Sequence, residues 1–237
     1  MALGALDNPM ALLKPSASCL VGVIASSTAL ARAVCSRRPP DLFELRLDAL
    51  RRFLDQVETA MSKLHAPLIL TARHPREGGL GQLRSGQREA LLRRFLEHAT
   101  LVDLELRSVR QMKVLMDEIR RRQIGLIISH HDLRDTPSRD ELRRLTNSAA
   151  AHQPAIIKIA SRTDTPDQLE RLVSFFAETN RSDFPIAAMG IGSLGLESRC
   201  LLDRLGSALT YVSLGEANVP GQATLGQLRR ARRAYIK

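Results

Sequence analysis

Short apolar runs rich in β-branched residues alternate along the chain with longer stretches of helix-forming sequence, and this alternation constrains the fold more than any other feature. The eight apolar runs are CLVGVIA (19–25), LFELRLDA (42–49), PLILTAR (67–73), LVDLEL (101–106), GLIISHH (125–131), AIIKIAS (155–161), FPIAAMG (184–190) and LTYVSLG (209–215). Stretches with helix formers begin near Leu50, Ser85, Val109, Arg139, Pro166 and Gly195, several after a Ser, Thr or Pro start signal. The sequence therefore predicts repeated strand-helix units.

Eight such units in 237 residues match a closed (β/α)8 barrel, also called a TIM barrel, whose usual length is about 250 residues. An open doubly wound sheet is the alternative, but no glycine-rich dinucleotide fingerprint follows the first strand. No linker or low-complexity segment divides the chain. We predict an α/β protein with one barrel domain over residues 13–237, preceded by an N-terminal extension over residues 1–12.

The chain carries a formal net charge of +10, which suggests a nucleic-acid role because a basic surface neutralises phosphates. The arginines, however, often occur in pairs within leucine-containing helical segments, where they are typical of a solvated helix face. Aromatic residues that could stack on bases make up only 3% of the chain. We therefore expect no nucleic-acid partner.

The cysteines favour a reducing compartment. The three cysteines are odd in number and far apart, and their spacing indicates neither a zinc site nor a disulfide framework. The apolar run from Cys19 to Val34 is interrupted by serines and a threonine, and no basic segment precedes the apolar part of the N-terminus. We expect a cytoplasmic protein that is neither secreted nor associated with a membrane.

Charged residues within the predicted strands mark the interior of the barrel. A parallel strand is covered by helices on one side and packed into the barrel on the other, so a charge within it is costly unless it is paired or lies at the C-terminal mouth. Glu44, Arg46 and Asp48 alternate with leucines, so we expect all three side chains to line the interior. A buried structural ion-pair network is the alternative interpretation.

Lys158 stands in the middle of the apolar run AIIKIAS, where its ammonium group cannot easily reach solvent. Burial disfavours the charged form and would leave an amine that can attack a carbonyl group. The alternative is a structural lysine that is neutralised by a carboxylate such as Asp103 or Glu105 in the run LVDLEL.

Two adjacent histidines end the fifth predicted strand. His130 and His131 must point to opposite sides, so only one of them can share the barrel interior with Lys158. Arg73 ends the third predicted strand and Glu77 follows in its loop, where a carboxylate could orient an imidazole and an arginine could bind a substrate oxygen. A lone histidine at a strand end is more often structural, but the neighbouring lysine favours a catalytic interpretation.

Two later loops complete the set of candidate residues. The string GSLGLESR (192–199) places Arg199 in a glycine-containing loop after the seventh strand. The string LGEANVPGQ (214–222) follows the eighth strand and is typical of a lid that ends in Gln222. Ordinary barrel loops are the alternative interpretation of both.

Taken in order, the strings ELRLD, TARHPREGG, SHHD with TPS, IIKIA, GSLGLESR and GEANVPGQ resemble the type I 3-dehydroquinate dehydratase family. They extend from Glu44 to Gln222, and the ordered combination is highly specific. The resemblance implies a (β/α)8 barrel and a lyase that dehydrates the substrate 3-dehydroquinate to 3-dehydroshikimate in the shikimate pathway. It also implies that the reaction passes through an imine on a lysine, with no metal and no cofactor.

The resemblance implies a role for each position that matches a family motif. Lys158 matches the lysine that forms the imine, His131 the general acid and base, and Glu77 the acid that orients the histidine. Arg199 matches the arginine that pairs with the substrate carboxylate. The other substrate-binding positions, which hold the ring hydroxyls or belong to the lid, are Glu44, Arg46, Arg73, Asn218 and Gln222.

The chain departs from the family pattern in two places. Asn218 and Val219 stand where a serine and an alanine usually precede PGQ, which would change substrate affinity or lid closure more than the reaction itself. Ile191 stands where a methionine is common, and it should change only the packing.

Three other functions are compatible with parts of the sequence. A ligand-binding sensor would be favoured by loss of the lysine or the histidine, and an RNA-associated protein by binding that weakens steeply with salt. Another Schiff-base lyase, such as an aldolase, would lack this set of arginines and the histidine after the fifth strand. We also allow for a homodimer. The sequence leaves open whether the pathway runs in the synthetic or the quinate-degrading direction.

Overall fold

The computed structural model describes residues 18–179 and 184–235. Its strands are β1 (Cys19–Ile24), β2 (Leu42–Arg46), β3 (Leu68–Thr71), β4 (Leu101–Glu105), β5 (Gly125–Asp132), β6 (Ile156–Arg162), β7 (Ile186–Ile191) and β8 (Leu209–Ser213). Its helices are α1 (Ser27–Val34), α2 (Leu47–Leu50), α3 (Leu54–Ala60), α4 (Ser85–Phe95), α5 (Lys113–Arg121), α6 (Arg139–Ala150), α7 (Pro166–Thr179), α8 (Gly195–Arg204) and α9 (Leu225–Tyr235). Every predicted apolar run thus contains a strand, whereas the N-terminal extension over residues 1–12 lies outside the described residues.

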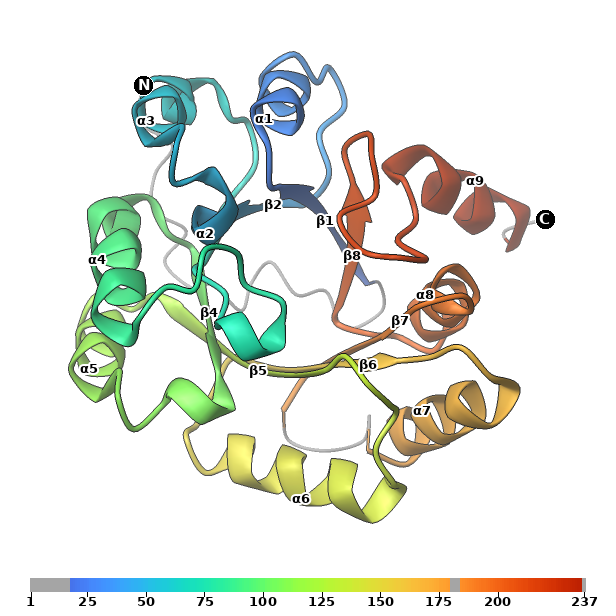
Figure 1. Cartoon of the computed structure of the whole chain (residues 1–237). Coiled ribbons are helices and arrows are strands. Elements are labelled where there is room, and N and C mark those ends of the chain that lie inside the picture. The colour runs from blue at the N-terminus through green and yellow to red at the C-terminus, as the bar shows by residue number, and fades with distance from the viewer. Residues whose placement is uncertain (1–17, 180–183, 236–237) are drawn as a thin grey trace.

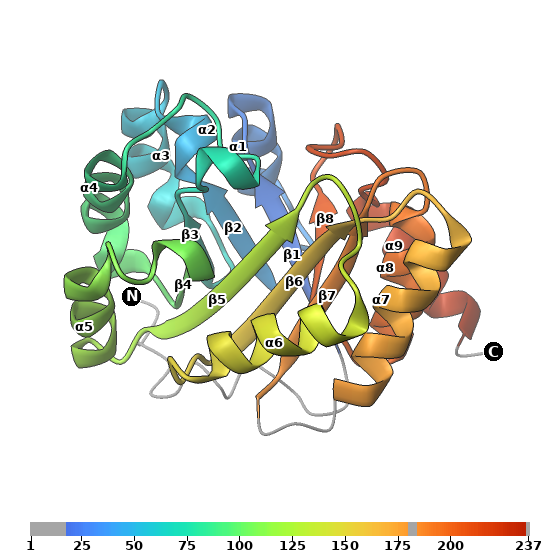
Figure 2. The same ribbon diagram turned by 60° about the horizontal axis from the view of Figure 1, so that its bottom comes forward.

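The strands form one parallel sheet in the order β7-β6-β5-β4-β3-β2-β1-β8. In Figure 1 they surround the centre of the molecule with the helices outside, and Figure 2 shows β5 and β6 running side by side in the same direction. The ends of the sheet meet where the backbone N–H of Ala208 donates to the carbonyl of Ile186 at 2.8 Å. The predicted (β/α)8 barrel is therefore confirmed, as a nearly closed barrel.

Strand parity divides the apolar residues between two cores. One core fills the interior of the barrel and includes Ile69 and Ile127. The other lies between the strands and the helices and includes Leu45 and Phe95. Because both faces of a parallel sheet are buried in this way, charged side chains that point inward are tolerated only where they are paired or lie at the mouth, where the strands end.

Strand β2 ends earlier than predicted. Its last residue is Arg46, and the chain then enters the short helix α2 at Leu47. Asp48 is therefore not part of an inward-pointing row, and that prediction is wrong. Its buried carboxylate accepts hydrogen bonds from the backbone N–H groups of Arg73 (3.1 Å) and Leu80 (3.0 Å) and pairs with Arg46 (3.0 Å). These bonds connect the loop after β3 to the end of β2.

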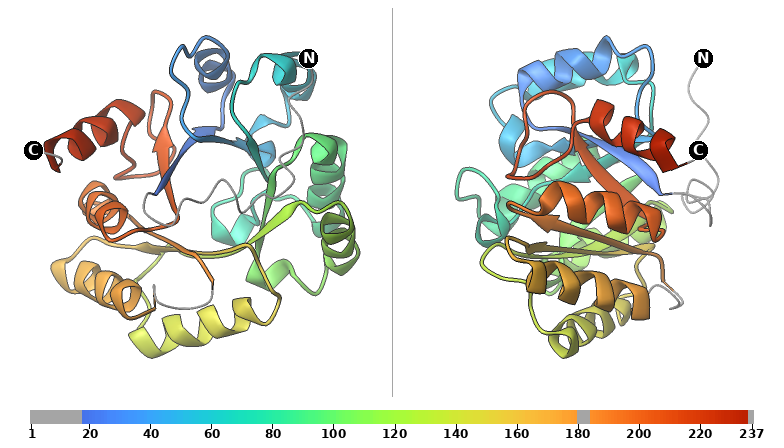
Figure 3. Two further views of the ribbon diagram at one scale, coloured as in Figure 1. Left: turned by 180° about the vertical axis from the view of Figure 1, so that it is seen from behind. Right: turned by 90° about the vertical axis from the view of Figure 1, so that its right-hand side faces the viewer.

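The first and last helices were not delimited from the sequence. Helix α1 begins after Ser26, whose side chain accepts a hydrogen bond from the backbone N–H of Ala29 at 3.1 Å. Helix α9 packs beside β8 (Figure 3). None of the helices in the described segments is long and apolar enough to cross a membrane.

Arg88 fixes helix α4 to the carboxyl ends of β3 and β4. Its side chain is fully buried, donates to the carbonyl of Ala72 at 2.6 Å and to the hydroxyl of Ser108 at 3.1 Å, and forms an ion pair with Glu105. Glu105 also accepts a hydrogen bond from the backbone N–H of His74 at 2.8 Å. Because desolvated charges are stable only when they are well paired, this cluster positions the loop that follows β3.

We expect Arg88→Met to lower the free energy of unfolding by about 3 to 5 kcal/mol, because Glu105 then stays buried with one cation fewer. The matched control is Arg93→Met on the same helix, since Arg93 pairs with Glu89 and Glu118 but its side chain is 36% exposed. The control substitution should lower the free energy of unfolding by less than about 1 kcal/mol. Urea unfolding followed by circular dichroism measures both variants, and equal losses would contradict the role of Arg88.

Candidate active site

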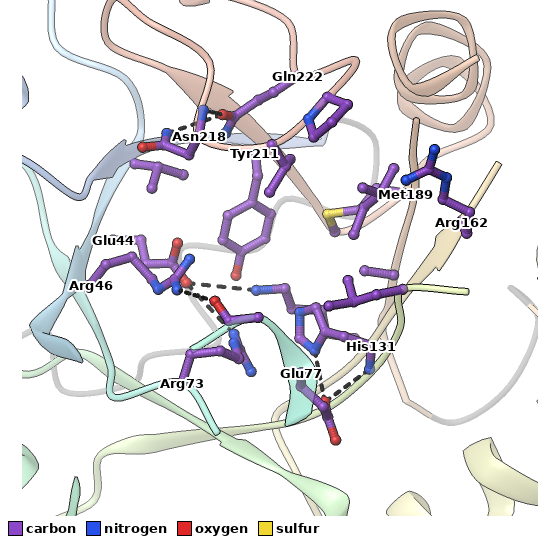
Figure 4. A pocket seen from close by; sticks show the side chains of 18 of the residues that line it. Glu44, Arg46, Arg73, Glu77, His131, Arg162, Met189, Tyr211, Asn218 and Gln222 are labelled. Atoms are coloured by element: carbon purple, nitrogen blue, oxygen red, sulfur yellow. Dashed lines mark hydrogen bonds and ion pairs between the residues drawn. The ribbon is translucent and has the colours of Figure 1, made fainter. Parts of the chain in front are cut away.

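A cavity of about 270 Å³ opens at the carboxyl ends of the strands, the end at which barrel enzymes bind their substrates. All the site residues predicted from the sequence line this cavity: Glu44, Arg46, Arg73, Glu77, His131, Lys158, Arg199, Asn218 and Gln222. Figure 4 shows Asn218 and Gln222 on the opposite side of the cavity from Glu77 and His131. The barrel thus brings together residues that are far apart in the sequence.

Lys158 is buried in β6, and its ammonium group is paired. Nζ lies 2.9 Å from Asp103 Oδ2 and 3.6 Å from Glu44 Oε1. It also lies over the ring of Tyr211, 3.8 Å from the ring centroid. The carboxylate partner considered from the sequence is therefore present in Asp103, while Glu105 pairs with arginines instead. These contacts hold the lysine nitrogen at a defined point of the cavity wall.

Asp103 is the centre of the buried ion network. Its Oδ1 accepts hydrogen bonds from Arg73 Nη1 (3.1 Å) and Ser129 Oγ (2.6 Å). Its Oδ2 accepts from Arg73 Nη2 (2.8 Å) and Lys158 Nζ (2.9 Å). Burial alone would raise the pKa of Asp103, but Arg73 and Lys158 hold it well below its usual range. Asp103 is therefore a carboxylate throughout the neutral pH range.

His131 and Glu77 form a pair beside the end of β5. Glu77 belongs to the 3-10 helix η3 (Pro75–Glu77), and its Oε2 accepts a hydrogen bond from the backbone N–H of His131 at 2.9 Å and lies 3.0 Å from His131 Nδ1. Its Oε1 lies 3.1 Å from Arg107 Nε. The parity prediction is confirmed, because His131 lines the cavity and His130 does not.

The surroundings set the charge of this pair. Burial, together with the cations Arg73 and Lys158, lowers the pKa of His131 well below 6.5. Burial and the carboxylate of Glu105 raise the pKa of Glu77 to about 7, although nearby arginines oppose the shift. The imidazole is therefore neutral at neutral pH. When Glu77 is ionised it accepts a hydrogen bond from Nδ1, which leaves a free lone pair on Nε2.

Glu44 and Arg46 extend from β2 into the cavity. Glu44 Oε1 accepts a hydrogen bond from the hydroxyl of Thr71 at 2.8 Å and lies 3.9 Å from Arg73 Nη2. Arg46 donates to the carbonyl of Gly78 at 3.2 Å. A carboxylate and a guanidinium group thus stand two residues apart on the same face of one strand, as predicted, and each keeps hydrogen-bonding capacity for a ligand.

Arg199 lies in helix α8 and not in a loop, which corrects the sequence prediction. The helix begins at Gly195, directly after the turn at Gly192, whose φ is +124°. Arg199 is 2% exposed, and its Nη1 donates to the carbonyls of Gly190 (2.6 Å), Gly195 (2.9 Å) and Gly221 (3.0 Å). Within the described residues its Nε has no hydrogen-bond partner and no carboxylate pairs with it. Burial lowers the pKa of Arg199 to about 10, so the group is still a cation at neutral pH.

The segment 215–222, which we call the lid, borders the cavity beside β8 (Figure 4). Gln222 Oε1 accepts hydrogen bonds from both the backbone N–H (2.7 Å) and the side-chain Nδ2 (3.0 Å) of Asn218. Gly221 has a φ of +70°, and a Cβ there would lie 2.1 Å from the carbonyl oxygen of Gly192. Asn218, which departs from the family pattern, therefore forms these hydrogen bonds with another residue of the lid.

Further residues of the cavity wall were not predicted as part of the site. They include Arg162 at the end of β6, Met189 in β7 and Tyr211 in β8. Two signals could have found them: Arg162 is a charge at a strand end, and Tyr211 lies on the inward face of its strand. An aromatic residue in an apolar run is more often part of the core, so parity alone would not have marked Tyr211 as a site residue.

Fold and cavity together define a class of protein: a (β/α)8-barrel enzyme with a buried lysine and a neutral histidine at the carboxyl ends of the strands. The model of the type I 3-dehydroquinase family matches residues 21–236, and the chain belongs to this family. It is therefore a hydro-lyase, a 3-dehydroquinate dehydratase of the shikimate pathway. In residues 18–179 and 184–235, no group of three or more His, Cys, Asp or Glu side chains is arranged to hold a metal ion.

Similarity to known proteins supports the assignment to this family. The 3-dehydroquinate dehydratase of Thermococcus gammatolerans is 34% identical over 191 residues, which cover 80% of this chain and 85% of that protein. The enzyme of the same name from Thermodesulfovibrio yellowstonii is 31% identical over 193 residues, which cover 78% of this chain and 81% of that protein. The crystal structure of 3-dehydroquinate dehydratase from Geobacillus kaustophilus has a TM-score of 0.81 at 25% identity, and the match covers 92% of this chain and 91% of that one.

We expect the imidazole of His131 to remain neutral at pH 6, where protonated Glu77 leaves its hydrogen on Nε2, and to carry the hydrogen on Nδ1 once Glu77 ionises above about pH 7. An imidazole with the ordinary pKa of about 6.5 would be mostly charged at pH 6. Nitrogen-15 NMR of histidine-labelled protein measures both the charge and the tautomer, and His131→Gln assigns the signal. The urea-unfolded protein is the control, in which the same residue should titrate at its ordinary pH. Ordinary titration of His131 in the folded protein would contradict the prediction.

Proposed function

We propose that the chain converts 3-dehydroquinate to 3-dehydroshikimate through an imine on Lys158, with His131 as the general base and acid. The observation that carries the proposal is the shared cavity of a buried, fixed lysine nitrogen and an imidazole that its surroundings keep neutral. An imine-forming amine and a proton acceptor are the two groups that this elimination requires.

The first step is attack of Lys158 on the ring ketone. The ammonium must first lose a proton, and the carboxylates of Asp103 and Glu44, at 2.9 and 3.6 Å from Nζ, can accept it. Loss of water from the adduct gives a cationic iminium group. This group withdraws electrons from the neighbouring carbon and makes its C–H bond acidic. The reaction therefore needs no metal or cofactor, because the lysine itself supplies the electron sink.

His131 then removes the proton from that carbon through Nε2, while Glu77 holds Nδ1. The electrons of the C–H bond form the enamine and then expel the hydroxyl group on the next carbon. The protonated imidazole returns its proton to the departing oxygen, which leaves as water. Hydrolysis of the remaining imine releases the product and regenerates the amine of Lys158.

Substrate binding is proposed for the rest of the cavity. Arg199 suits the substrate carboxylate, because it is a buried cation that no acid of the described chain neutralises and a planar guanidinium offers parallel donors. Glu44 and Arg46 suit the ring hydroxyls. Arg73 donates to Asp103 from both Nη1 and Nη2, so its main effect should be to orient that carboxylate and not to bind the substrate directly. The lid, with Asn218 and Gln222, would exclude water from the imine.

We propose no nucleic-acid partner, since several of the surface arginines are paired with acids. Arg94, for example, lies 2.7 Å from Glu58 and 2.8 Å from Asp55. Arg143 pairs with acids in the same manner. Paired, solvated groups of this kind offer phosphates less free positive charge than unpaired arginines would.

We expect sodium borohydride, added with 3-dehydroquinate, to leave a stable reduced adduct on Lys158, because reduction of an imine cannot be reversed by water. Peptide mapping by mass spectrometry locates the adduct. Lys158→Ala should show neither adduct nor activity, whereas the control Lys113→Ala, which changes an exposed lysine of α5, should keep both. An active wild-type enzyme that shows no adduct would refute the imine mechanism.

The pH dependence of kcat/KM should report the ionisation of Glu77. Below its pKa of about 7 the protonated carboxyl group donates to Nδ1, so the hydrogen moves to Nε2 and the base is lost. We therefore expect kcat/KM to rise with pH and to level off above about pH 7. Glu77→Gln should remove this limb and lower kcat on the order of 10²-fold. A limb near pH 7 that persists in Glu77→Gln would contradict the assignment.

A further inference from the structure

The ring of Tyr211 covers the nitrogen on which the imine would form, but the hydroxyl group of this residue has no partner. Lys158 Nζ lies 3.8 Å from the ring centroid, and the side chain is 3% exposed. Within the described part of the chain no hydrogen bond satisfies the buried hydroxyl. Figure 4 shows this hydroxyl directed away from the lid, toward the side of the cavity where Glu44 and Arg73 lie.

The ring alone does not explain a tyrosine at this position. A phenylalanine would cover Lys158 equally well and would avoid burying an unsatisfied hydroxyl, which costs free energy. That cost disappears if a bound ligand supplies an acceptor. Burial, with Glu44 and Asp103 nearby, raises the pKa of Tyr211 well above its ordinary value of 10. The group is therefore a neutral phenol, which can donate a hydrogen bond and does not act as a base.

We propose that Tyr211 is a further catalytic residue, whose hydroxyl donates a hydrogen bond to the substrate ketone oxygen while Lys158 attacks and while that oxygen leaves. The inference rests on the proposed imine. An oxygen on the carbon bonded to Nζ can lie beside the ring that covers Nζ, where the hydroxyl of the same ring can reach it. Of the groups described as contacting Nζ, Asp103 and Glu44 are carboxylates and only accept, so the phenol is the donor.

The step balances without a proton from the phenol. Attack forms the C–N bond and moves the carbonyl electrons onto oxygen. The C–O bond then breaks, and the nitrogen lone pair forms the C=N bond. Two of the ammonium protons end on the departing oxygen, which leaves as water, and the third stays on the iminium nitrogen. Tyr211 stabilises the negative charge that builds on oxygen in both stages, as an oxyanion-hole donor does.

The experiment compares the wild type with Tyr211→Phe, which keeps the ring, and Tyr211→Leu, which removes it. Rapid mixing with 3-dehydroquinate and quenching in borohydride gives the rate of adduct formation on Lys158. We expect the phenylalanine variant to lower the rate of adduct formation by about 10²-fold and to lower kcat by a smaller factor. The isotope effect on kcat, measured with substrate deuterated at the carbon that loses its proton, should fall toward one, because imine formation becomes limiting. Tyr211→Leu should be slower still.

The outcomes separate the two proposals. If the wild type forms no adduct on Lys158, the imine mechanism fails and the role of Tyr211 fails with it. If the wild type forms the adduct and Tyr211→Phe forms it at the same rate with an unchanged isotope effect, only the role of Tyr211 is refuted. Thermal unfolding shows whether the variant is folded. Loss of the orphan hydroxyl should leave the ligand-free protein at least as stable as the wild type.

Discussion

One fully buried carboxylate, that of Asp103, positions the charged groups on which the cavity depends. Its two oxygens accept hydrogen bonds from Arg73, Ser129 and Lys158. Asp103 lies on β4, Ser129 on β5 and Lys158 on β6, so the register of three neighbouring strands decides where the lysine nitrogen stands. Ions at this depth would be unstable without such pairing, because desolvation is offset only by good geometry. The barrel and the site are therefore specified by the same contacts.

The network also suits the proposed chemistry because its net charge does not change when the imine forms. Lys158 carries one positive charge as an ammonium and one as an iminium, so Asp103 and Glu44 face the same charge before and after the step. Preorganised groups of this kind stabilise a charged intermediate without rearrangement. The same cations, Lys158 and Arg73, contribute to keeping His131 neutral. The same ion network thus holds the iminium group on Lys158 in place and keeps His131 unprotonated.

Alternation along the strands was enough to predict the barrel and much of the cavity. Parity showed that only one of His130 and His131 could face the interior, and the family resemblance assigned that place to His131, which lines the cavity. An acid in the run LVDLEL was correctly considered as the partner of Lys158. Prediction failed where an element ends for reasons that lie far away in the chain. Asp48 leaves the line of β2 because its carboxylate binds N–H groups of the loop after β3. The orphan hydroxyl of Tyr211 is visible only in three dimensions, since its lack of a partner depends on all its neighbours.

Arg199, the proposed binding group for the substrate carboxylate, is also connected to the lid. Arg199 donates to Gly190 at the end of β7 and to Gly221 in the lid, so the guanidinium bridges the barrel wall and the lid. An anion bound to Arg199 would neutralise a buried cation. It would also lie against the lid, which is already hydrogen-bonded to Arg199 through Gly221. Asn218 donates hydrogen bonds to Gln222, which directly follows Gly221 in the same segment, but Asn218 itself has no bond to Arg199 among the described contacts. The departure from the family pattern therefore falls where it can alter the closing of the lid and leave the proposed carboxylate anchor intact.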